Sequence, residues 1–178
     1  MNQGPLSALL NSPAVARVRR NHALEHATIQ ILSERNKALA LMGRSSLWGF
    51  YIYGEVDTKD VLDAAQEGLR RLKAGEQGMA IHPNCGSNYV VAGAIAGLGA
   101  FISLGGLSRN RREGLLDRLS RLPLAWAVGT LGVMLSRPLG AILQARVTTK
   151  AEMGDLRIES IIRNEHPGTV VHQVRTTG

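Results

Sequence analysis

The sequence predicts an α+β fold whose small α/β domain is discontinuous along the chain and is interrupted by a two-helix transmembrane hairpin. Long apolar segments without charge lie in the middle of the chain, and segments with helical or strand-like periodicity lie on both sides of them. A chain of 178 residues has room for one ordinary domain, or for a smaller domain with a membrane element. We therefore expect an N-terminal α+β part, a helical hairpin and C-terminal strands that complete the first part, at residues 1–87, 88–144 and 145–178.

The N-terminal part is predicted to contain a helix, two strands, a second helix and a third strand. Ser12 before Pro13 is typical of a helix start, and apolar residues then recur every three or four positions as far as Arg35. This pattern predicts an amphipathic helix. A second helix is expected from Asp57 or Thr58 through Lys73. Short apolar or aromatic runs predict the three strands, the first two joined by the loop GRSSL, at residues 38–42, 48–56 and 79–82.

Two apolar segments are long enough to cross a lipid bilayer. Residues 89–107 carry no charge, and residues 123–143 carry only Arg137, which precedes a proline. Nineteen helical residues at 1.5 Å each approach the thickness of the hydrocarbon core. Gly93 and Gly97 form a small-xxx-small pair that would let another helix approach closely. The alternative for the first segment is the buried helix of a soluble protein.

The C-terminal part is predicted to return to the N-terminal sheet. Residues 156–163 and 169–175 have strand character, and we expect His166 and His172 of this hairpin to be surface residues. A two-helix insertion brings the chain back to the same side of the membrane, so these strands can complete the sheet. Basic residues between 109 and 121 favour a cytoplasmic loop. The N-terminus, however, does not resemble a signal peptide, and we expect a multi-pass cell-membrane protein whose soluble domain is cytoplasmic.

The net charge of +7 raises the possibility of nucleic-acid binding. The basic residues, however, form no stripe interleaved with aromatic residues, and the sequence contains no familiar nucleic-acid motif. Basic residues that flank apolar segments are typical of membrane proteins. We therefore expect the lipid bilayer, rather than nucleic acid, to be the partner of this chain. The sequence leaves the oligomeric state open.

The segment NHALEHATI carries the first candidate site. His22 and His26 are four residues apart on a predicted helix, so both imidazoles lie on one face and can reach one ion. Glu25 falls within the same arc and completes a His-x-x-Glu-His pattern. In the inverzincin arrangement of this pattern, the histidines hold zinc and the glutamate is the general base. A solvated helix face is the alternative.

The segment HPNCGSN carries the second candidate site. Pro83 keeps His82 extended, and Gly86 permits a sharp turn after Cys85, so the imidazole and the thiol can converge. Imidazole and thiolate are ligands that zinc favours. Two alternatives are an inert cysteine in a turn and a cysteine nucleophile activated by a histidine. A single cysteine excludes an intrachain disulfide.

Together the two segments resemble the YqhQ-like bacterial membrane proteins, which are described as metal-dependent enzymes of unknown function. The resemblance covers about sixteen positions and the apolar segment that follows, and it includes the four candidate ligands and Glu25. This chain departs from that pattern at Ala23, Leu24, Ala27 and Ser87, none of which is a candidate ligand. The resemblance implies a metal site but no substrate.

The number of ligands separates the hypotheses about function. Glu25 could itself be a ligand, which leaves no obvious base, and in a membrane module without metal the histidines would serve hydrogen-bonding networks. If His22, His26 and only one of His82 and Cys85 bind Zn²⁺, a fourth position can hold water, and Glu25 can be the catalytic base. The chain would then be a membrane-bound zinc-dependent hydrolase, by analogy a peptidase with a membrane-associated protein substrate. If all four residues bind, the site is closed and structural, which suits a nonenzymatic scaffold or assembly protein. Because the apolar hairpin begins directly after the second segment, we expect the site at the membrane surface.

Overall fold

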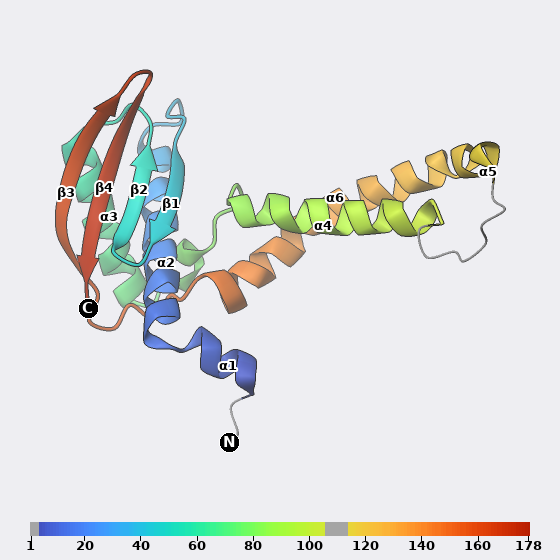
Figure 1. Cartoon of the computed structure of the whole chain (residues 1–178). Coiled ribbons are helices and arrows are strands. Elements are labelled where there is room, and N and C mark those ends of the chain that lie inside the picture. Colours follow the sequence, from blue (N-terminus) through green and yellow to red (C-terminus); the bar gives the residue numbers. More distant parts are fainter. Residues whose placement is uncertain (1–3, 106–113) are drawn as a thin grey trace. The chain divides into compact units, whose positions relative to one another are not determined.

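The computed structural model describes residues 4–105 and 114–178, and it divides into two compact units. The first unit combines Met1–His82 with Leu143–Gly178, and the second is Pro83–Ile142. The first unit holds the sheet, and the second consists of helices (Figure 1).

Three helices belong to the first unit, α1 (Pro5–Leu10), α2 (Pro13–Arg35) and α3 (Thr58–Lys73). Helices α2 and α3 begin and end where the sequence predicts. Helix α2 is more deeply buried than an amphipathic surface helix, because it packs against α3, the strands β1 (Met42–Ser46) and β2 (Gly49–Tyr53), and the short 3₁₀ helix η1 (Gln77–Ala80). Polar residues of α2 are consequently buried along with its apolar ones, among them Arg19, Asn21, Glu25, His26 and Thr28.

The sheet has four antiparallel strands in the order β1-β2-β4-β3. Because the C-terminal β4 pairs with β2, the predicted discontinuous α+β fold is confirmed. Helices α2 and α3 cover one face of this sheet (Figure 1). The strands are β1 (Met42–Ser46), β2 (Gly49–Tyr53), β3 (Arg157–His166) and β4 (Thr169–Thr177).

Two of the predicted strands are wrong in detail. The first strand begins at Met42, and most of the segment GRSSL, predicted to be a loop, is strand β1 paired with β2. The chain turns later, and Gly49 has a φ of 137°, where a Cβ would collide with the carbonyl of Val174. The third strand, predicted at 79–82, is replaced by η1 (Gln77–Ala80). Its buried Met79 and Ala80 pack against the core instead of pairing with a strand.

The prediction that His172 lies on the surface is wrong. Every second residue of β4 faces the core, namely Val170, His172, Val174 and Thr176. The His172 side chain has no exposed surface, and its Nε2 lies 3.1 Å from the Thr58 hydroxyl. His166, at the end of β3, is exposed as predicted.

Burial lowers the pKa of His172, and the positive charge of Arg163 lowers it further, while Asp57 and Glu55 oppose the shift. The folded state therefore keeps this imidazole neutral, whereas the unfolded chain takes up a proton near pH 6.5. We expect stability to be lost as pH falls below about 6.5, by at most about 1.4 kcal/mol per pH unit. The measurement is the melting temperature between pH 5 and pH 7.5, with a chelator present so that metal affinity does not contribute.

His166→Gln is the matched control, because His166 is an exposed histidine of the same hairpin. His166→Gln should keep the pH dependence, and His172→Gln should flatten it. An equally steep dependence in His172→Gln would show that another group is responsible.

The second unit contains α4 (Gly86–Ser103), α5 (Leu115–Ser120) and α6 (Leu122–Leu143). Helices α4 and α6 are long and apolar enough to cross a membrane by length and composition. The predicted spans largely coincide with them, although residues 106 and 107 of the first span lie outside the described residues, as does part of the predicted basic loop.

Small residues bring α4 and α6 together within the second unit. A Cβ at Gly132 would lie 3.0 Å from Ile95, and one at Gly99 would lie 2.6 Å from Val128. Gly93 and Gly97 are the pair expected to let a helix approach. A Cβ at either glycine would have no described atom within 4 Å. Large apolar side chains on the outer surfaces of the two helices are exposed, including Val90, Leu98, Trp126, Leu131 and Met134. Such surfaces are compatible with contact to lipid.

Candidate metal centre

Helix α2 places two histidines side by side within the first unit. The His22 and His26 rings have centroids 4.3 Å apart, as expected for residues one helical turn apart. His26 is buried and His22 is half-buried. The spacing recognised in the sequence thus produces a pair of imidazoles in a largely buried position.

Backbone carbonyl groups orient both rings. The Nδ1 of His22 lies 2.9 Å from the Thr148 carbonyl, and the Nδ1 of His26 lies 2.8 Å from the Ala80 carbonyl. Because a carbonyl oxygen only accepts, each Nδ1 carries a proton, and in the neutral ring Nε2 keeps its lone pair. This is the outer-shell arrangement common for histidines that bind metals through Nε2.

The Nε2 atom of His26 is buried and has no hydrogen-bond partner among the described residues. A buried lone pair without a partner is unusual in native structures. A metal ion satisfies such a nitrogen, and the donor set around it fits one.

His82 is held in the first unit by the side chain of Gln144. The His82 N–H donates to the Gln144 Oε1 at 2.8 Å, and the Gln144 Nε2 donates to the His82 carbonyl at 3.1 Å. The His82 ring centroid then lies 5.8 Å from that of His26. Gln144 is fully buried and begins a π-helical turn, Gln144–Thr148, a kind of distortion frequent at functional sites.

Gln144 was not recognised from the sequence. The available signal is an amide that directly follows a long apolar helix, where a buried polar side chain requires a partner. Thr148, whose carbonyl accepts from His22, lies in the same turn. One short segment therefore orients two of the candidate ligands.

Cys85 follows His82 by only three residues, which span at most about 11 Å of chain. Its buried thiol lies 3.2 Å from the Ser87 hydroxyl, and the residue precedes the first turn of α4. Cys85 belongs to the second unit, whereas His22, His26 and His82 belong to the first. Within the first unit the structure therefore brings together three of the four predicted ligands, His22, His26 and His82, and Cys85 follows them along the chain.

Glu25 is buried and lies against β1. Its carboxylate accepts a hydrogen bond from the Ser45 hydroxyl, and a Cβ at Gly43 would overlap the same carboxylate. Both Gly43 and Ser45 belong to the segment that the sequence suggested was a loop, so their relation to Glu25 was missed. Gly43 and Ser45 are two residues apart, so they lie on one face of β1. If the segment had been assigned as a strand, this shared face would have been visible from the sequence.

Comparisons with known proteins identify the family of the chain. Residues 17–161 match a family described as a domain of unknown function, DUF6391. The chain belongs to this DUF6391 family. It is also similar to an uncharacterized protein of Picosynechococcus sp., with 31% identity over 172 residues that cover 89% of this chain and 78% of the relative. No solved structure matches the chain. The matched region of this DUF6391 protein contains all the candidate ligands and Glu25.

Proposed function

We propose that this DUF6391 protein is a membrane-bound zinc-dependent hydrolase with His22, His26 and Cys85 as its metal ligands. The observation that carries the proposal is the buried Nε2 of His26, which has no hydrogen-bond partner in the described part of the chain, while Nδ1 is anchored to a carbonyl. The resemblance of the two motifs to YqhQ-like proteins supports the same metal hypothesis. A zinc ion with three protein ligands supplies Lewis acidity and lowers the pKa of a water in its fourth position.

The side chains of this chain have separate roles in the proposed reaction. His22 and His26 present fixed tautomers, because the Thr148 and Ala80 carbonyls hold their Nδ1 protons. Glu25 is the proposed general base, which takes a proton at a carboxylate oxygen. The Ser45 hydroxyl donates to that carboxylate and so restricts its orientation.

The substrate class follows by analogy with other His-x-x-Glu-His enzymes, which favours a peptide bond. The two candidate membrane helices favour a membrane-associated protein as the substrate. We also propose that both helices span the cell membrane and that the soluble unit is cytoplasmic. The basic loop predicted between the helices is the feature of the sequence that opposes this orientation.

A closed structural site is the second candidate function, and the position of His82 favours it. Its ring lies 5.8 Å from that of His26, and its backbone is fixed by Gln144. With His82 as a fourth ligand, the tetrahedral shell of a zinc ion would be closed. The protein would then be a scaffold or assembly protein in which the metal stabilises the fold.

Metal analysis of the full-length protein in detergent distinguishes the two functions. We expect one zinc per chain in the wild type and in Glu25→Gln, because Glu25 is the base and not a ligand. Cys85→Ser should lose zinc, and His82→Gln should retain it. Cleavage of a mixed fluorescent peptide library should fall at least about a hundredfold in Glu25→Gln.

Cobalt substitution gives an independent readout, since a thiolate ligand produces a charge-transfer absorption band that Cys85→Ser removes. If zinc binding requires His82 as well as His22, His26 and Cys85, the site is closed, and the structural function replaces the hydrolase proposal. The absence of any bound transition metal after gentle purification would overturn both functions. His166→Gln, which changes an exposed histidine, controls for nonspecific binding.

A further inference from the structure

A cavity of about 680 Å³ lies in the first unit, apart from the candidate metal ligands. It is lined by residues of α1, the first turns of α2 and the segment that follows α6. Four cationic side chains line it, and Glu152 is the one acidic residue among the lining residues, which gives a formal charge of +3. The cationic residues are Arg19, Arg20, Arg146 and Lys150.

Arg19 builds the wall of the cavity. Its guanidinium is buried and donates to the carbonyls of Leu10, Arg146 and Thr149, at 3.1, 2.9 and 2.8 Å. It therefore joins α1, α2 and the segment after α6. All three acceptors are neutral, so they do not cancel its charge. Burial accordingly lowers the pKa of Arg19, and Glu152 only partly opposes this shift.

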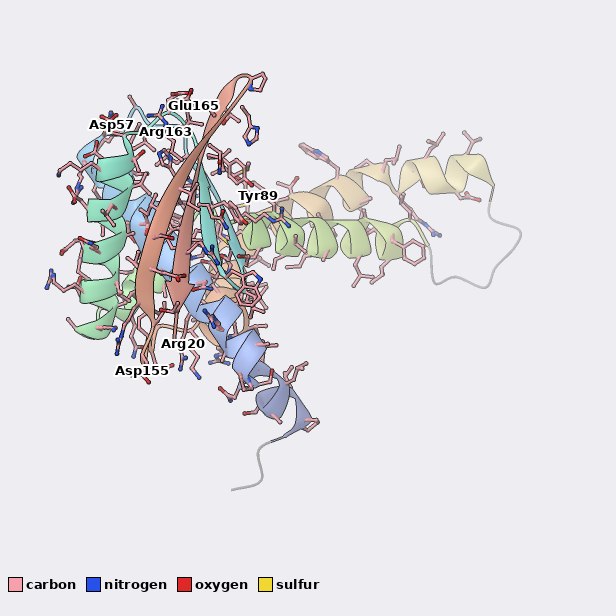
Figure 2. The ribbon with its side chains drawn as sticks, turned by 60° about the vertical axis from the view of Figure 1, so that its left-hand side comes forward. Arg20, Asp57, Tyr89, Asp155, Arg163 and Glu165 are labelled. Carbon is pink, nitrogen blue, oxygen red and sulfur yellow. The ribbon has the colours of Figure 1, made fainter. Side chains whose placement is uncertain are left out.

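The other three cations form no ion pair with any described residue. Arg20, which is labelled in Figure 2, donates from Nε to the Glu152 carbonyl at 2.9 Å. The Lys150 Nζ lies 3.2 Å from the amide oxygen of Asn11. Arg146 is exposed. These contacts involve neutral oxygens, so an anion in the cavity would gain charge-assisted hydrogen bonds without displacing an ion pair.

The lining also has an apolar side. Leu6 and Leu10 of α1 line the cavity, and Leu6 is 63% exposed. Arg146 and Lys150 follow the end of α6 at Leu143 by three and seven residues, so the chain places these cations close to the end of a candidate membrane helix. Cations beside apolar groups at such a position suit an anionic group that carries a hydrophobic part.

We propose that this cavity binds a phosphate-bearing anion, with Arg146 and Lys150 as its direct contacts and with Arg19 and Arg20 as the positively charged wall. The same phosphate chemistry is offered by an anionic lipid headgroup and by a free phosphate ester. The site is distinct from the metal centre and does not depend on the proposed hydrolase activity.

The test uses the full-length chain in two arms. In the lipid arm, phosphatidylcholine nanodiscs containing phosphatidic acid are compared with phosphatidylcholine alone, and the lipid retained by the protein is measured by native mass spectrometry. In the soluble arm, inorganic phosphate and glycerol 3-phosphate are titrated by calorimetry. We expect Arg146→Gln combined with Lys150→Gln to weaken binding at least about tenfold, and added salt to weaken the binding that remains.

Arg44→Gln combined with Arg157→Gln is the matched control, because it removes the same charge from exposed residues that do not line the cavity. Selective binding in the lipid arm identifies a headgroup, and binding only in the soluble arm identifies a free phosphate ester. Either result supports the site, provided that the Arg44→Gln, Arg157→Gln control binds the anion as tightly as the wild type does. No binding in either arm, or an equal loss in the control pair, would overturn the proposal.

Discussion

Replacement of His26 by alanine is expected to abolish stoichiometric zinc binding. The substitution removes the buried Nε2, which has no hydrogen-bond partner among the described residues, and with it one of the three proposed ligand atoms. Loss of an outer-shell partner typically weakens metal affinity by 10- to 100-fold, so loss of a ligand should exceed about a hundredfold. Metal content of the purified protein and competition with a chromophoric zinc chelator measure the effect.

Folding must be separated from metal binding in this experiment, because His26 is buried and its Nδ1 is bonded to Ala80. His26→Gln keeps a side chain that can donate to the Ala80 carbonyl, and it should fold while losing zinc. His172→Gln is the matched control, since His172 is an equally buried histidine that is not among the proposed ligands. Full zinc occupancy in a folded His26→Gln protein would contradict the assignment of this residue as a ligand.

Local patterns in the sequence predicted the elements that depend on local physics. Proline after Ser12 and the spacing of apolar residues located α2, and the i, i+4 rule placed His22 beside His26. The long apolar segments located α4 and α6. In each case neighbours in the sequence supply the deciding interactions.

Long-range contacts explain what was missed. The segment from Gly43 to Ser46 has weak strand propensity, and its pairing with β2 makes it a strand. The role of Gln144 depends on His82, which is 62 residues away in the sequence. The sequence does contain a signal that His172 is buried, because it is two residues from both Val170 and Val174 on the same strand.

Gly43→Ala is expected to destabilise the protein by about 1–3 kcal/mol, which is typical of overpacking a buried site. The added Cβ would overlap the Glu25 carboxylate, so either Glu25 leaves its place beside Ser45 or β1 shifts away from α2. Gly78→Ala is the matched control, because a Cβ at Gly78 meets nothing within 4 Å. Thermal and chemical unfolding of the full-length protein compare the two variants.

A double-mutant cycle shows whether Glu25 is the group that Gly43 accommodates. Glu25→Ala removes the carboxylate, so Gly43→Ala should then lower stability by much less, which corresponds to a coupling of about 1 kcal/mol or more. Additive effects would mean that Gly43 serves the strand and not the glutamate. If the coupling is present, Gly43→Ala should also reduce hydrolysis at unchanged zinc content, because it moves the proposed base without touching a ligand. Loss of zinc in Gly43→Ala would instead indicate that the carboxylate, and with it Glu25, supports the metal.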